Sequence, residues 1–208
     1  RAAQTRARLL LIAGSFVLPR NFALRCAILP APIDPAPPPP QTAVMNGPFA
    51  SRLTRQPLPF DREAAADCAA TFADMPPDLR GLLSATASCS QYLRSLMLTE
   101  ADWLREALLQ PPETVCAQVL AGLEAAQVDA LPDALRAAKR RFALITALAD
   151  LGGVWSLMQV TGALTDLADR AVDLALRRLV AEEIRRGKLP GAVAEDAETA
   201  GGMTCLAM

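Results

Sequence analysis

The feature that most constrains the fold is a succession of helix-like segments, separated by proline and glycine, that runs from Asp61 to Arg186. Apolar residues recur there every three or four positions, which is the spacing of one helix face. The prolines and glycines that end these segments recur at intervals typical of a helix bundle. Alanine and leucine, both strong helix formers, supply much of the 52% hydrophobic content, and aromatic residues make up only 4%. The pattern predicts a mainly α protein with an aliphatic core.

The helix boundaries are predicted from capping residues, prolines and glycines. Thr99 is a good N-cap, with Asp102 three residues later in the manner of a capping box. Pro132 stands where a helix accepts proline in its first turn, and Gly152-Gly153 stops the helix that follows. We expect seven helices, at residues 61–73, 78–87, 91–98, 99–109, 111–127, 133–151 and 161–186.

The two longest predicted helices each carry an apolar stripe. Side chains three or four positions apart lie on one face of a helix, so each stripe is predicted to face the core. The expected buried residues are Leu135, Ala138, Phe142, Ile145 and Ala149 in the first helix, and Leu164, Leu167, Ala171 and Leu174 in the second.

Residues 1–44 differ from the rest. The apolar run Leu9–Leu18 is shorter than the ~20 residues that a membrane-spanning helix needs. It resembles the start of a secretion signal but lacks a clear cleavage site. The proline-rich stretch Pro30–Pro40 favours polyproline II. Either this segment is a disordered arm or weak targeting signal, or translation begins at Met45 and the preceding codons are upstream sequence read in frame. We favour the start at Met45.

The last residues, 191–208, form a third region. Glu195–Gly202 is predicted to be an acidic loop, and the apolar run Met203–Met208 is predicted to be a buried strand. That strand has nothing beside it to pair with. We therefore interpret 45–190 as a helical region that leads into the first strand of a truncated α/β domain.

The chain has no histidine among its 208 residues. This excludes Ser-His-Asp and Cys-His catalysis, histidine-liganded zinc and histidine general-base chemistry. The five cysteines are scattered, without a CxxC pair or a disulfide framework. They are typical of reduced thiols in the cytosol that behave as small buried hydrophobic groups.

The charge is unevenly distributed. Residues 1–60 carry seven Arg and one Asp, a net charge of +6, whereas residues 61–208 carry 14 basic and 21 acidic groups, a net charge of −7. The acidic part is a poor candidate for binding nucleic acid, and its densest basic run, Lys139-Arg140-Arg141, is interpreted as a solvated helix face. We expect neither a nucleic-acid partner nor a membrane.

Three carboxylates, Asp166, Asp169 and Asp173, share one face of the last predicted helix. They could hold a divalent cation in a bundle. However, Arg170 and Arg177 each follow an aspartate by four residues, which is the spacing of surface ion pairs. Di-metal bundles also use an ExxH partner, and the chain has none. We favour a solvated, ion-paired face over a metal site.

No other motif carries chemistry. Glu182, Glu183, Arg185 and Arg186 continue the charged face, with Glu182 and Arg186 four apart. The pairs Gly152-Gly153 and Gly201-Gly202 are not phosphate loops, since neither GxGxxG nor GxxxxGK[ST] occurs. We interpret Trp103, Trp155 and Tyr92 as core or groove-filling groups. No residue is assigned as catalytic, cofactor-binding or metal-binding.

Four segments, taken in order, resemble the bacterial glutamine-synthetase adenylyltransferase family. They are Gly81–Ser95, with a Gly followed at a distance by Ser-x-Tyr-Leu, Ala138–Gly153, Val160–Asp173, and the acidic loop followed by Gly201–Met208. Together the resemblance covers roughly 49–208. The start at Met45 also resembles how such proteins begin in some bacteria.

The resemblance implies part of a large cytoplasmic enzyme with two nucleotidyltransferase domains, which use ATP and Mg²⁺. One domain attaches AMP to a tyrosine of glutamine synthetase, and the other removes it by phosphorolysis, under control of a PII-type signal protein and glutamine. The family's first catalytic motif, a Gly-Lys-x-Gly turn followed by Ser-Asp-x-Asp, would begin after Met208. The chain is thus expected to be an inactive N-terminal part, and the alternative is a stand-alone helical interaction module.

Overall fold

The computed structural model describes residues 47–203 and residue 205. These residues form helices and contain no strand, which confirms the mainly α prediction. The interpretations of residues 1–44 and of a start at Met45 lie outside the described residues. In chain order the elements are η1 (Phe49–Arg52), α2 (Arg62–Thr71), α3 (Pro77–Cys89), α4 (Gln91–Thr99), α5 (Ala101–Ala107), α6 (Pro112–Glu124), η2 (Val128–Ala130), α7 (Leu131–Leu151), α8 (Leu157–Arg185) and η3 (Ala194–Gly202).

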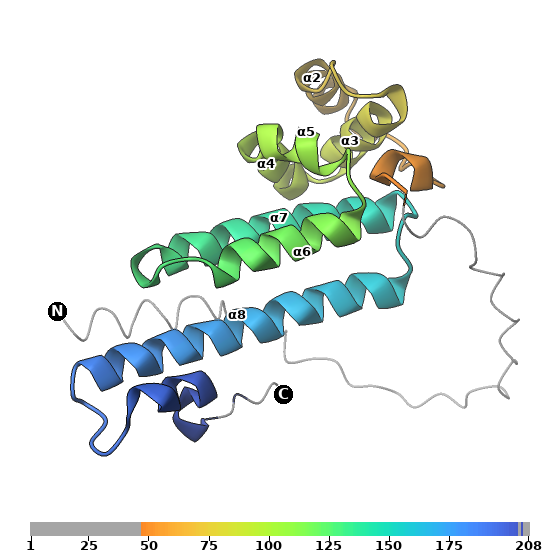
Figure 1. Cartoon of the computed structure of the whole chain (residues 1–208). Helices are drawn as coiled ribbons and strands as arrows, with labels where there is room; N and C mark the ends of the chain where they lie inside the picture. Colours follow the sequence, from red (N-terminus) through yellow and green to blue (C-terminus); the bar gives the residue numbers. More distant parts are fainter. Residues whose placement is uncertain (1–46, 204, 206–208) are drawn as a thin grey trace, which may run out of the picture. The chain divides into compact units, whose positions relative to one another are not determined.

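Helices α6, α7 and α8 lie side by side, and α7 packs extensively against both of the others (Figure 1). The shorter helices α2 to α5 form a second group, in which α3 contacts α2, α4 and α7. The short η3 folds back against α8. Within the described part of the chain, no helix combines the length and the apolar character that crossing a membrane requires.

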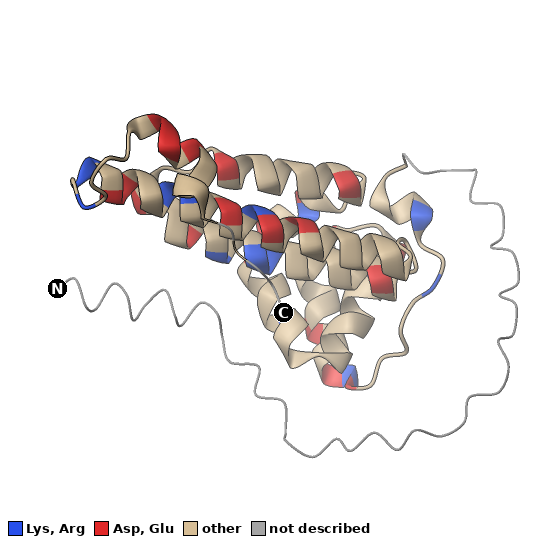
Figure 2. Cartoon of the chain, turned by 90° about the horizontal axis from the view of Figure 1, so that it is seen from below, with Lys and Arg blue, Asp and Glu red and all other residues tan. Residues whose placement is uncertain are grey.

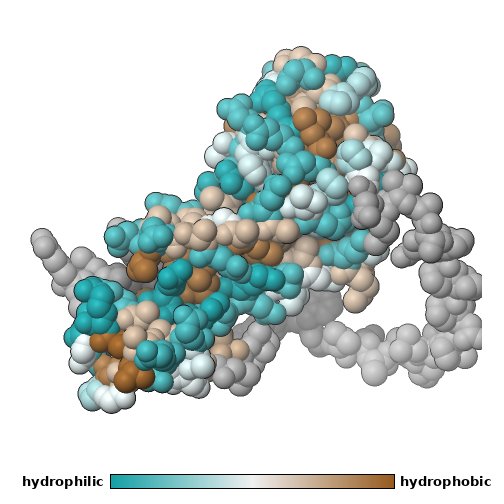
Figure 3. All heavy atoms as spheres, in the orientation of Figure 1, coloured by the Kyte–Doolittle hydropathy of each residue, from teal (hydrophilic) through white to brown (hydrophobic). Residues whose placement is uncertain are grey.

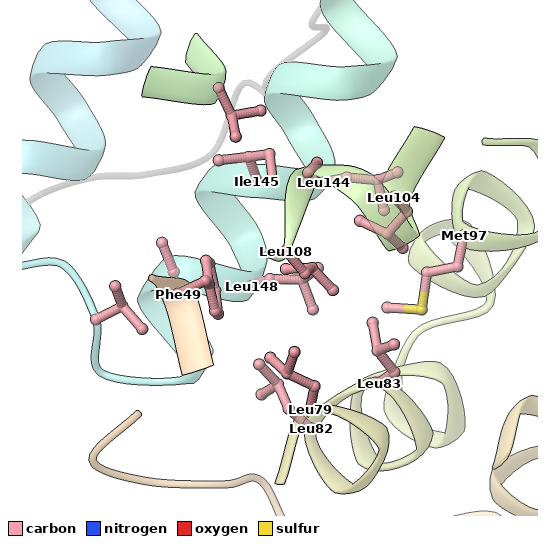
Figure 4. Close-up of a cluster of buried hydrophobic side chains, with 14 of the residues drawn as sticks. Phe49, Leu79, Leu82, Leu83, Met97, Leu104, Leu108, Leu144, Ile145 and Leu148 are labelled. Carbon is pink, nitrogen blue, oxygen red and sulfur yellow. The ribbon is translucent and has the colours of Figure 1, made fainter. Parts of the chain in front are cut away.

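The core is aliphatic, as predicted. Leucines of α3, α5 and α7 meet at its centre (Figure 4). Burying one such side chain contributes roughly 1.5–3 kcal/mol. On α7, four of the five predicted stripe residues are buried, and Leu135 is partly buried against a second, smaller cluster. The core side chains with no exposed surface include Phe49, Phe72, Leu79, Leu82, Leu83, Met97, Leu104, Leu108, Leu144 and Leu148.

The stripe predicted for α8 is partly wrong. Leu174 is buried and Leu167 packs against the core, but Leu164 is 43% exposed. The inward line of the helix runs through Val160 and Ala163 to Leu167. Leu164 lies about 100° further round the helix than Ala163 and does not join this line.

The helices begin and end close to the predicted residues, with two exceptions. The capping box at Thr99 is wrong, because Thr99 ends α4 and its hydroxyl donates to the Ser95 carbonyl at 2.9 Å. Helix α5 begins after Glu100, without a side-chain cap. Helix α8 begins four residues earlier than predicted, because Ser156 and Gln159 form a capping box there.

The C-terminal region also differs from its prediction. The stretch expected to be an acidic loop forms the 3-10 segment η3, at whose start the Asp196 carboxylate accepts a hydrogen bond from the Val193 amide at 2.8 Å. Ala200 at its end is buried. Of the predicted strand Met203–Met208, only Met203 and Cys205 are described, so that prediction lies largely outside the described residues.

An N-terminal strap, defined here as residues 49–55, closes one side of the core. Phe49 is fully buried and its amide donates to the Gln110 carbonyl at 3.1 Å. The amides of Thr54 and Arg55 both donate to the Gly152 carbonyl, at 3.0 and 3.2 Å. A Cβ at Gly153, whose φ is +65°, would collide with the Thr54 hydroxyl. The glycine pair therefore ends α7 and also lets the strap approach it closely.

Candidate functional site

A groove with a volume of about 540 Å³ lies between α6 and α8. We call it the α6/α8 groove. It arises because α6 and α8 both pack on α7 but contact each other much less. Its walls carry small residues, namely Ala117 and Ala121 of α6 and Gly162 and Ala163 of α8, and Phe142 of α7 also lines it. In the space-filling view, polar residues cover most of the visible face and apolar residues emerge in separate patches (Figure 3).

Glu113 lines the groove and is bound both by the strap and by the residues that lead into α8. Its carboxylate accepts hydrogen bonds from Arg52 at 2.7 Å and from the Trp155 indole at 2.6 Å. Arg52, nearly buried, also donates to the Val154 carbonyl at 3.2 Å. Burial raises the pKa of Glu113, but the hydrogen bonds from Arg52 and Trp155 outweigh it and hold the pKa below its usual range.

The remaining ionisable groups of the groove are an ion pair, an unpaired aspartate and a thiol. Glu124 pairs with Arg170 at 2.6 Å, so these two charges neutralise each other across α6 and α8. Asp166 also lines the groove but makes no ion pair with any described residue. Cys116 lies in the wall, and burial, reinforced by the nearby Glu113, raises the pKa of its thiol to about 12. The groove therefore combines small and apolar residues with charged groups, of which only Asp166 has no ion-pair partner among the described residues.

A second polar cluster lies apart from the groove. Glu100, only 7% exposed, accepts hydrogen bonds from Arg140 at 2.7 Å and from Arg141 at 3.0 Å. The Arg141 guanidinium also lies 5.0 Å from the centre of the Trp103 ring. The interpretation of Lys139-Arg140-Arg141 as a solvated face is incomplete, because its two arginines are only partly exposed and tie α7 to the junction of α4 and α5.

The three aspartates on α8 do not form a metal site with one another. Among residues 47–203 and 205, no group of three or more Cys, Asp or Glu side chains could hold a metal ion. The predicted pair of Asp173 with Arg177 is confirmed at 2.6 Å, whereas Arg170 pairs with Glu124 instead of Asp166. Acidic and basic side chains alternate along this helix (Figure 2).

The other residues considered from the sequence have mainly structural positions. Trp155 lines the groove and Trp103 packs beneath Arg141, as expected of groove-filling and core groups, but Tyr92 is 57% exposed. Glu182 pairs with Arg186 at 2.7 Å as predicted, and hydrogen bonds from Arg185 lower the pKa of Glu182 to about 2. The cysteine prediction holds for Cys68 and Cys116, which are buried, and not for the exposed Cys89 and Cys205; Cys26 lies outside the described residues.

Comparison with known proteins gives these observations a context. The model of a protein family described as glutamate-ammonia ligase adenylyltransferase matches residues 81–208, which include every residue that lines the groove. The chain belongs to this family. The match confirms the resemblance carried by Gly81–Ser95, Ala138–Gly153 and Val160–Asp173.

Several curated relatives are named bifunctional glutamine synthetase adenylyltransferase/adenylyl-removing enzyme. The relative from Rhodopseudomonas palustris is 38% identical over 148 residues, which is 69% of this chain and 15% of that protein. Those from a Bradyrhizobium species and from Caulobacter vibrioides are 40% identical over 134 residues, 62% of this chain and 14% and 13% of theirs. The chain therefore spans only about 15% of the length of such relatives. No solved structure matches it.

Sequence reasoning missed the two carboxylates that organise the fold and the groove. Glu100 and Glu113 each bind partners that are 40 or more residues away in the sequence, and no local spacing predicts such a pair. Arg52 and Glu113 lie 61 residues apart in the sequence, so only the fold brings them together.

Proposed function

We propose that this chain is the N-terminal, helical part of an enzyme that adenylylates and deadenylylates glutamine synthetase. The single observation that carries the proposal is the family match across 81–208, supported by the names of the relatives. In this proposal 45–190 form the helical region, 191–208 lead into the first nucleotidyltransferase domain, and 1–44 are an arm or upstream sequence. The role of the helical region is to pack against the deadenylylating domain and help to shape it.

The catalytic and regulatory features that we propose belong to the longer enzyme. It would transfer AMP from ATP to a tyrosine of glutamine synthetase, with Mg²⁺ stabilising charge on the transferred phosphoryl group, and would remove AMP by phosphorolysis. We also infer regulation by a PII-type protein and a cytoplasmic location. The described residues offer no ligand set that fits Mg²⁺, so we assign no step of the reaction to them. The isolated chain is expected to be inactive because the family's first catalytic motif is expected after Met208.

The proposal is tested in two steps. The reading frame after the codon for Met208 is sequenced, and we expect it to encode a Gly-Lys-x-Gly turn followed by Ser-Asp-x-Asp. The purified chain and the longer polypeptide are then compared for phosphate-dependent release of AMP from adenylylated glutamine synthetase. Release by the longer polypeptide alone supports the proposal. A stop codon after Met208, or AMP release by the chain alone, would refute it.

A further inference from the structure

The walls of the α6/α8 groove leave room for a third element. Ala117 and Ala121 on one side and Gly162 and Ala163 on the other present almost no side chain. A Cβ built on Gly162 would meet no atom within 4 Å. Small residues on two facing helices create a depression into which the side-chain ridge of another helix can fit.

The lining of the groove combines apolar and charged side chains. Leu120 of α6 and Phe142 of α7 lie among the small residues, and Glu113, Glu124, Asp166 and Arg170 line it as well. A lining that combines apolar and charged groups fits an amphipathic helix, which has an apolar and a charged face.

The charge of the groove narrows the choice of occupant. Glu113 is neutralised by Arg52, and Glu124 by Arg170. Asp166 is the lining carboxylate that has no ion-pair partner within the described residues. A helix that presents a Lys or Arg beside its apolar face would satisfy this charge, and an acidic helix would be repelled.

We propose that the α6/α8 groove is the docking site for an amphipathic helix of the same enzyme, from the part that lies beyond this chain, with a basic side chain directed at Asp166. This inference rests on the proposed function, because the relatives are several times longer than the matched region. A covalently connected helix acts at an effective concentration in the millimolar range, so a shallow groove of this kind is filled in the intact enzyme without high intrinsic affinity.

The test compares thiol labelling in the isolated chain and in the longer, active polypeptide. Cysteine is introduced by Ala121→Cys, on the groove wall, or by Gly122→Cys, its exposed neighbour outside the groove. Labelling by a maleimide is followed for each peptide by mass spectrometry. We expect labelling at Ala121→Cys to slow at least tenfold in the longer polypeptide and labelling at Gly122→Cys to change less than twofold. Equal rates for Ala121→Cys in both proteins would overturn the proposal.

The basic side chain is tested by reversing the charge of Asp166. Asp166→Lys in the longer polypeptide should restore fast labelling at Ala121→Cys, whereas Asp169→Lys, on the same helix but outside the groove lining, should not. Protection that survives Asp166→Lys would refute a basic occupant. A longer polypeptide that releases AMP but leaves the groove open refutes this inference alone. Absence of AMP release by the longer polypeptide refutes the proposed function instead.

Discussion

The Glu100 cluster offers a sharp test of how the two groups of helices are joined. Replacing Glu100 by glutamine preserves the shape of the side chain but removes its charge. Charge-assisted hydrogen bonds contribute roughly 1.5–3 kcal/mol each when well shielded. Both arginine partners are more than a third exposed, at 37% and 35%, so solvent screening reduces each contribution to about 1 kcal/mol. We therefore expect E100Q to lower the free energy of unfolding by about 2 kcal/mol at pH 7.

The assay is urea unfolding followed by circular dichroism at 222 nm. Glu106→Gln is the matched control, because Glu106 lies on α5 as an exposed carboxylate without an ion pair among the described residues, and it should cost less than about 0.5 kcal/mol. In thermal unfolding, E100Q should lower Tm by roughly 4–8 °C for a unit of this size. Equal effects of E100Q and E106Q would refute the assignment of Glu100 as a specific junction.

The same cluster predicts a pH dependence with a definite sign. Burial raises the pKa of Glu100, but hydrogen bonds from Arg140 and Arg141, together with their charges, lower it overall. A carboxyl whose folded pKa is lowered adds stability above its unfolded pKa, which is about 4.3. That stability is lost as the pH falls through the folded pKa. The difference in the free energy of unfolding between the wild type and E100Q should therefore stay constant from about pH 7 to 5 and become smaller below about pH 4. A gap that persists unchanged at low pH would refute this reasoning.

Three further predictions concern the strap, the start of α8 and the buried thiols. In urea unfolding, Gly153→Ala should lower the free energy of unfolding by more than Gly187→Ala. Both glycines have a positive φ, which costs about 1–2 kcal/mol for alanine, but only at Gly153 would the new Cβ also collide with the strap. Equal costs would show that the strap can move aside without a penalty. Ser156→Ala should cost about 1 kcal/mol and reduce the ellipticity at 222 nm, and no change in either would contradict the capping box. At pH 8 the Cys116 thiol should react with an aromatic disulfide reagent at least about tenfold more slowly than the exposed Cys89, and both should react rapidly in urea; comparable rates in the folded protein would contradict the burial of Cys116.

The helices were predictable because their signals are local. Asp61 caps α2, Pro132 stands in the first turn of α7 and Gly152 ends that helix, and each acts within a few residues of its own position. Helix α8 begins earlier than predicted, although Ser156 and Gln159 also form a local signal. Long-range pairs gave no such signal.

Packing between helices explains the failures at Leu164 and at the Lys139–Arg141 run. Leu164 has the right spacing for the apolar stripe, but Ala163 packs against the core whereas Leu164 remains 43% exposed. Arg140 and Arg141 were predicted to be solvated, yet both also bind the buried carboxylate of Glu100, 40 and 41 residues earlier in the chain. Periodicity determines which residues share a face of a helix, whereas only the neighbouring helices determine which face is buried.

The structural unit extends beyond the part of the chain that the family model matches. The match begins at Gly81, inside α3, but Phe49 and Phe72 are fully buried in the same core. Arg52 of the strap holds Glu113, and Glu113 in turn accepts the indole hydrogen bond of Trp155 in the groove. The strap thus contacts the end of the groove through Arg52 and Glu113. The groove proposed to receive the rest of the enzyme thus depends on residues that lie before the matched region.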